Sequence, residues 1–185
     1  MASSVEICNL ALVHLGQEPI LTLDDTSKEA RLCRRLYDPT LEALLRSYPW
    51  SFAIRRVLLA QEVEPPVFGF SYQYTLPSDC MRIVSLSVPD GMYSIEQNKV
   101  LTDEPEVELR YVYKPKSAND FDAQFVQVFA LRLAKLMCQS LTADQDWYVK
   151  ITQQEMQAIM LAQHTSAIES SPQTVIEGNW IPSRY

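Results

Sequence analysis

The hydrophobic pattern of the chain changes its period twice, and this limits the folds that the chain can adopt. Residues 1–62 and 117–170 carry apolar side chains at the 3.6-residue period of amphipathic helices. Residues 63–116 instead alternate apolar and polar side chains, which is typical of strands with one solvated face. Pro65-Pro66 stands at the first change. We therefore expect an α+β fold in which a small antiparallel β-sheet lobe is inserted into a helical body.

The helical body should contain about four helices with recognisable end signals. Ser3 and Glu6 form a capping box before the first helix, and Gly16 stands where a C′ glycine would end it. Thr26 and Glu29 repeat the capping-box pattern and are expected to open the second helix.

Pro39 lies inside the apolar period of the second helix, so we expect a kink or a break just before it. A third helix should run to about Leu141. Its candidate caps are Asn119, Asp120 and Asp122. A last helix, over about 147–168, follows a cap at Asp144 or Asp146 and is rich in Gln and Met with few charges.

Charge and cysteine content argue against several classes of protein. The formal charge is −7 and the isoelectric point is near 4.8, which disfavours a sequence-independent nucleic-acid grip because that needs a basic face. The four cysteines form no CxxC pair and have no neighbouring histidine, so we expect reduced, mostly buried thiols.

The N-terminus lacks a signal-peptide pattern, and no apolar stretch reaches the roughly 18 residues of a membrane span. We expect a soluble, intracellular protein.

No motif in the sequence indicates a catalytic, cofactor or metal site. His14 and His164 are the only histidines, and neither belongs to an HExxH motif or a triad. The helix dipole explains Asp24-Asp25, and solvation explains the other carboxylate pairs, although carboxylates from distant segments could still meet in three dimensions. We expect a protein that is not an enzyme and that needs no cofactor.

Arginine is the main basic feature of residues 1–62, where six arginines stand against one lysine. The two clusters are Arg31, Arg34 and Arg35, which share one helix face, and Arg55 with Arg56. One explanation is pairing within the chain to Glu29, Asp38 and Glu42. The other is a subunit interface, where Arg is enriched over Lys, and the arginine excess favours this second explanation.

Two further segments are candidate contacts. The tripeptide Pro89, Asp90 and Gly91 predicts a tight turn in the β lobe. Residues 171–185 show no period yet keep apolar and aromatic side chains, whereas free tails are normally polar. We expect an extended arm that docks on another protein or folds back on the body. Its candidate contacts are Val175, Ile176, Trp180, Ile181, Arg184 and Tyr185.

Three segments taken together resemble a head-to-tail adaptor of tailed phages, and more narrowly the tail tubular protein A, or gatekeeper, family of short-tailed phages. They are SSVEICNLALVHLG at 3–16, EARLCRRLYDPTLEALLRSYPWSFA at 29–53 and YQYTLPSDCMRI at 72–83. The resemblance covers about residues 3–165, and the arm has no residue-by-residue match.

The resemblance implies a structural virion protein, a ring of twelve copies beneath the portal that is assembled in the host cytoplasm. In such a ring the helical body contacts the portal, the β lobe faces the tail nozzle protein through a turn such as 89–91, and the arm reaches along the portal. Genomic DNA leaves through the lumen without specific binding, and an acidic lumen would repel its phosphates.

Two alternatives stay open beside the ring adaptor. A head-completion connector of a long-tailed phage would share the helical core, but such connectors are more nearly all-helical than this sequence predicts. A cell-wall glycosidase would need two facing carboxylates across a cleft.

Overall fold

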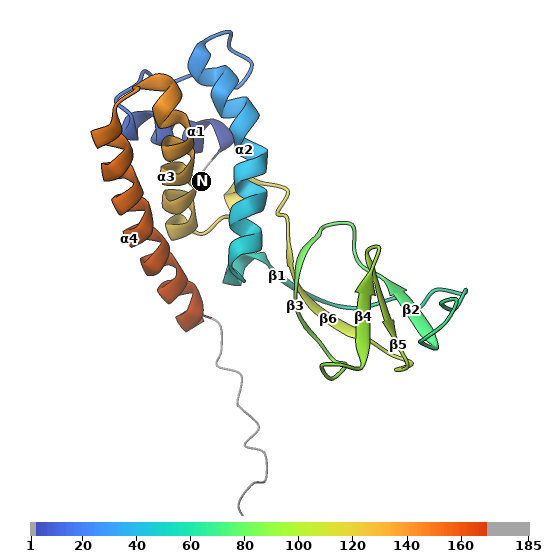
Figure 1. Ribbon diagram of the computed structural model, residues 1–185. Coiled ribbons are helices and arrows are strands. Elements are labelled where there is room, and N and C mark those ends of the chain that lie inside the picture. The colour runs from blue at the N-terminus through green and yellow to red at the C-terminus, as the bar shows by residue number, and fades with distance from the viewer. Residues whose placement is uncertain (1–2, 170–185) are drawn as a thin grey trace, which may run out of the picture.

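Helices form one part of the structure and short strands form the other (Figure 1). The computed structural model describes residues 3–169. The helices are α1 (Ser4–His14), α2 (Lys28–Ser47), α3 (Ala123–Leu141) and α4 (Gln145–Glu169). The strands are β1 (Ile54–Leu58), β2 (Tyr72–Thr75), β3 (Cys80–Leu86), β4 (Tyr93–Glu96), β5 (Lys99–Thr102) and β6 (Glu108–Tyr113). The expected α+β class is confirmed.

Helix α1 begins and ends at the residues that the sequence indicates. The Ser3 hydroxyl accepts a hydrogen bond from the Glu6 amide at 3.1 Å, and the Glu6 carboxylate accepts one from the Ser3 amide at 2.6 Å. At the other end the Gly16 amide donates to Val13 and the Gln17 amide donates to Leu12, both at 3.0 Å. This is a Schellman motif, and it requires the positive φ of 64° that Gly16 adopts.

Helix α2 differs from the expectation at two points. Its cap is Ser27 rather than Thr26, because the Ser27 hydroxyl is the one that accepts from the Ala30 amide. Of the kink or break predicted at Pro39, the break does not occur, since α2 continues from Lys28 to Ser47 with the proline inside. A proline removes one backbone donor. The buried side chains of Leu41, Leu44 and Leu45 hold the following turns in place.

Helix α3 forms the centre of the helical body and lies between α2 and α4 in Figure 1. Asp122 caps it by accepting from the amides of Gln124 and Phe125. Phe125 is fully buried, with its ring centroid 5.1 Å from that of Trp50 and 4.9 Å from that of Phe52. These edge-on contacts tie α3 to the segment that leaves α2.

The β lobe contains two three-stranded antiparallel sheets, in the orders β1-β6-β3 and β2-β5-β4, instead of the single sheet that the sequence suggests. Strand β1 also lies within the residues expected to be helical, and it becomes a strand by pairing with β6. Strands β4 and β5 form a hairpin through Gln97 and Asn98, whose φ angles of 44° and 65° are typical of a type I′ turn.

A second core fills the space between the two sheets. Tyr74 and Val100 of one sheet pack with Leu109 and Tyr111 of the other, and all four are buried. The Tyr74 hydroxyl donates to the carbonyl of Glu104 at 2.8 Å, so this buried ring keeps its polar atom satisfied. Each part of the structure therefore has its own hydrophobic core.

Polar contacts fix the β lobe to the C-terminal half of α2. Arg82 of β3 donates to the last carbonyls of α2, Arg46 at 3.2 Å and Ser47 at 3.3 Å. Lys114 lies between Glu42 at 2.9 Å and Asp38 at 3.0 Å, and the hydrogen bond with Glu42 raises the pKa of Lys114. Because Arg82 satisfies carbonyls that a helix end leaves unpaired, the helix end and the sheet form one joint.

One titratable group of the helical body lies in an unfavourable place for a charge. His14 is half-buried at the end of α1, and its Nε2 atom is buried with no hydrogen-bond partner among residues 3–169. Burial lowers the pKa of His14.

We expect the His14→Gln variant to be less sensitive to acid than the wild type. The unfolded chain protonates this histidine near pH 6.5, at a higher pH than the folded protein does. Wild-type stability is therefore complete above about pH 6.5 and falls as the pH drops through the lowered pKa. Urea unfolding at about pH 7.5 and 5.5 measures the difference. A His164→Gln control should keep the wild-type dependence, and an equal loss in all three proteins would contradict the assignment.

Candidate interaction surfaces

The arginine face of α2 is exposed as the sequence suggests. Arg31, Arg34 and Arg35 are all exposed, and Arg34 reaches Asp24 at 3.6 Å between side chains that are 57% and 93% exposed. An ion pair this open contributes little to stability. Asp38, one of the acids expected as a partner, binds Lys114 instead. The arginine face thus keeps charges that are free for an external contact.

The second arginine cluster is divided between the two faces of β1. Arg55 forms an ion pair with Asp79 at 2.8 Å and stacks over the ring of Tyr113, 3.7 Å from its centroid. Arg56 points to the other face, where it lies directly opposite Arg110 of β6. Of this cluster only Arg56 is available for a partner. Strand β1 follows the C-terminal end of α2, so the two clusters do not form one surface (Figure 1).

The predicted tight turn at residues 89–91 is present. The Met92 amide donates to the Pro89 carbonyl at 3.1 Å, and Gly91 adopts a φ of 86°. Pro89, Asp90 and Gly91 are exposed between β3 and β4. The turn is therefore accessible to another protein.

Helix α4 carries an apolar surface that sequence reasoning did not single out. Its buried residues, Ile151, Glu155, Ala162 and Ser166, lie on one face, towards the body. Large apolar side chains lie elsewhere around the helix and are 46–70% exposed. These form the apolar α4 surface: Val149, Met156, Met160, Leu161 and Ile168. The abundance of Met and the scarcity of charge in this helix were the sequence signal for it.

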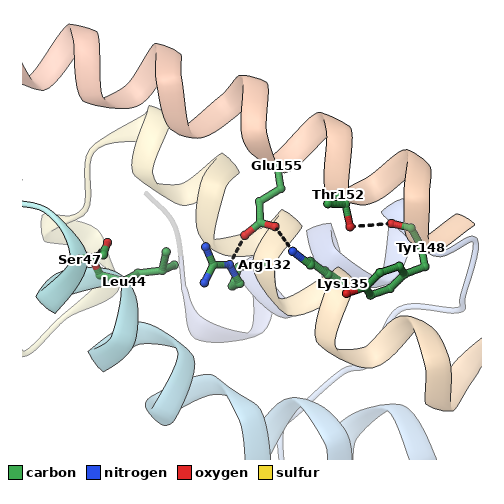
Figure 2. Close-up of polar contacts among 7 residues, drawn as sticks. All are labelled: Leu44, Ser47, Arg132, Lys135, Tyr148, Thr152 and Glu155. Atoms are coloured by element: carbon green, nitrogen blue, oxygen red, sulfur yellow. Dashed lines mark hydrogen bonds and ion pairs between the residues drawn. The ribbon is translucent and has the colours of Figure 1, made fainter.

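A buried ionic contact holds α4 on α3 (Figure 2). Glu155 points from α4 towards α3, is 3% exposed, and accepts hydrogen bonds from Arg132 and Lys135. The Lys135 Nζ atom lies 2.9 Å from the Glu155 carboxylate and 5.9 Å from the ring centroid of Tyr148. Figure 2 shows the carboxylate between its two cations, so α4 is fixed in register against α3.

Contacts near its C-terminal end set the angle of α4. The Tyr48 hydroxyl donates to the Gln163 carbonyl at 3.2 Å, and the Ser51 amide donates to the Ser166 hydroxyl at 2.9 Å. Contacts on the buried face of α4 thus hold the helix both near its middle and near its C-terminal end. Its apolar surface is a fixed feature of the body.

Two of the carboxylates that could suggest acid–base chemistry have structural partners. Glu62 accepts from Lys99 at 2.7 Å, and this contact lowers the pKa of Glu62. Asp103 accepts from the amide and hydroxyl of Ser71, both at 2.8 Å. Within residues 3–169 no group of three or more His, Cys, Asp or Glu side chains is placed to hold a metal ion.

The arm candidates, Val175, Ile176, Trp180, Ile181, Arg184 and Tyr185, lie outside the described residues. Of the helices within residues 3–169, none is long and apolar enough to cross a membrane.

A scan against models of known protein families gives no match, and neither does a search of curated protein sequences.

We expect Glu155→Gln to destabilise the helical body. The substitution keeps the size of the side chain but leaves Arg132 and Lys135 without their counter-charge at a buried position. The free energy of unfolding in urea should fall by about 2–3 kcal/mol. Glu18→Gln, at an exposed position, is the control and should change it by less than about 0.5 kcal/mol. A loss no larger than in this control would show that the ionic contact does not hold α4.

Proposed function

We propose that this chain is a structural subunit of a phage virion, a ring adaptor that joins the portal to the tail. The resemblance of residues 3–16, 29–53 and 72–83 to gatekeeper proteins is one support. The division into a helical body and a separate β lobe is another, because an adaptor must offer different surfaces to its partners above and below.

The apolar α4 surface is the observation that carries this proposal. Scattered exposed apolar residues are ordinary, but five large ones on the outward side of one helix are a concentration of the kind that marks a protein–protein contact. Methionine suits such a contact because its flexible side chain fills irregular gaps. The contacts of Glu155 and Ser166 keep this surface turned outward before any partner is present.

In the proposed ring, the neighbouring copy covers the apolar α4 surface. A closed ring needs a heterologous interface, in which two different surfaces of the same subunit meet. The arginine face of α2, formed by Arg31, Arg34 and Arg35, is the candidate for the second surface, since α3 separates α2 from α4 (Figure 1). Each copy would then receive one neighbour at α4 and offer α2 to the next.

The portal serves as the template for assembly in this proposal. The arm carries apolar residues whose ordering is compensated only when a groove between portal subunits receives them. Trp180, Ile181 and Tyr185 are the proposed anchors, because buried aromatic side chains carry much of the energy of an interface. The β lobe then faces the tail nozzle protein, and DNA passes through an acidic lumen without being retained.

We expect Met156→Lys with Met160→Lys to prevent ring formation on the portal while the chain stays folded. Both side chains are more than half exposed, so unfolding in urea should change by less than about 0.5 kcal/mol. Mass photometry of the variant mixed with portal measures the assembly. The matched control is Met156→Leu with Met160→Leu, which changes the same two positions but keeps the surface apolar and should form rings as the wild type does. Rings formed equally by both variants would contradict the role of the apolar α4 surface.

Removal of residues 171–185 should abolish attachment to the portal and leave the body folded. The far-ultraviolet circular dichroism and the urea midpoint should stay those of the full chain, whereas co-sedimentation with portal should be lost. Attachment that survives the truncation would contradict the proposed arm. The full chain with Trp180→Ala and Tyr185→Ala is a milder variant, expected to weaken attachment by about tenfold or more.

A further inference from the structure

Two arginines lie side by side on adjacent strands of the sheet formed by β1, β6 and β3. In the antiparallel register of β1 and β6, Arg56 lies directly opposite Arg110, so both side chains leave the same face of the sheet. Like charges in this position destabilise a sheet. Among the described residues, neither guanidinium has a carboxylate within 4.0 Å.

One of these arginines also has a buried donor without a partner. The Nε atom of Arg110 is shielded from solvent, and it makes no hydrogen bond within residues 3–169. Buried donors are almost always paired in folded proteins, so an unpaired one requires an explanation. Arg110 contrasts with Arg55, on the opposite face of β1, whose guanidinium is paired with Asp79.

The two arginines open into a groove of about 510 Å³ on this face of the β lobe. Its other walls combine hydroxyls with apolar side chains: Ser85, Ser87 and Leu58. Glu108 is the one acidic residue that lines it, so the groove carries a net positive charge in a chain whose net charge is −7. The hydroxyl of Ser85, opposite Arg110 in the register of β3 and β6, adds a donor beside the guanidinium pair.

We propose that Arg56 and Arg110 form an oxyanion-binding site that accepts a carboxylate from an acidic segment of a partner protein. A guanidinium presents planar donors that bind a carboxylate in a bidentate manner, and a bound carboxylate relieves the repulsion between the two arginines. It also lies where the unpaired Nε donor of Arg110 can be satisfied.

The walls of the groove favour a peptide over a nucleic acid. Leu58, which leaves the same face as Arg56, is 56% exposed, and this apolar contact suits a peptide whose acidic side chains alternate with apolar ones. The acidic balance of the whole chain also opposes a nucleic acid.

The identity of the partner rests on the proposed function. In a ring adaptor the β lobe faces the tail, so the acidic segment would belong to the nozzle protein. The groove would then be a tail-side contact in addition to the turn at 89–91. The chemistry of the site does not depend on this identity.

The test uses the full chain and a fluorescein-labelled peptide of about six residues in which Glu alternates with Leu. Fluorescence anisotropy should show saturable binding that weakens as salt is added. A peptide with Gln in place of Glu, an oligothymidylate of equal charge and inorganic phosphate are the competing ligands. The variants are Arg56→Gln and Arg110→Gln, and the control is Lys116→Gln with Lys150→Gln, which removes two exposed positive charges outside the groove.

We expect each groove variant to weaken binding of the acidic peptide by about tenfold or more, and the lysine control to leave it unchanged. Arg56→Gln should unfold at the same urea concentration as the wild type or a higher one, because a like-charge pair is removed. Equal weakening by the control, tighter binding of the oligothymidylate, or a clear loss of stability in Arg56→Gln would overturn the proposal. Arg56→Gln, at an exposed position, decides the test if Arg110→Gln does not fold.

The outcome is separable from that of the proposed function. Peptide binding is measured on the isolated chain, whereas ring assembly is measured on the portal and depends on α4 and the arm. A groove that binds no acidic peptide leaves the ring proposal intact. If the chain binds the peptide but never assembles on the portal, the carboxylate-binding site is supported and the proposed adaptor function is contradicted.

Discussion

The central position of α3 is the constraint on which the rest of the structure depends. Helices α1, α2 and α4 all pack against it, and its side chains at Phe125, Phe129, Leu133 and Met137 are fully buried. Because α3 already has neighbours, α4 can lay only one face against it. The remaining surface of α4 is left to solvent, and it is apolar. The feature that we assign to assembly thus follows from how the core of the body is filled.

In the β lobe, too, one face of an element is buried and the other is left partly exposed. One face of the β1-β6-β3 sheet turns towards the second sheet and carries the buried Leu109 and Tyr111. Where this sheet packs on the helical body it does so through Ile54, Val112 and two side chains of β3, Met81 and Val84, whereas Arg56 lies further along the sheet and is exposed. The apolar α4 surface and the arginine groove are therefore both surfaces that neither hydrophobic core buries.

Sequence reasoning succeeded where the structure is decided by neighbours along the chain. Ser3 with Glu6, Gly16 and Asp122 mark helix ends because their partners lie within three or four residues. It failed where the structure depends on pairing between segments that are far apart in the sequence. The segment IRRVL has no alternation of its own, and it forms β1 only because β6 lies beside it. The pairing of Arg56 with Arg110 likewise depends on a register between strands that are some fifty residues apart.

The most direct test of the account is the particle mass of the purified chain, alone and mixed with the portal of the same phage, with negative-stain images of both samples. A ring adaptor templated by the portal should be a small species alone and a ring stacked on the portal in the mixture. A ring that forms without portal would keep the adaptor but contradict the template. No association in either sample would contradict the structural role, and the release of dye from labelled peptidoglycan would then be the next measurement.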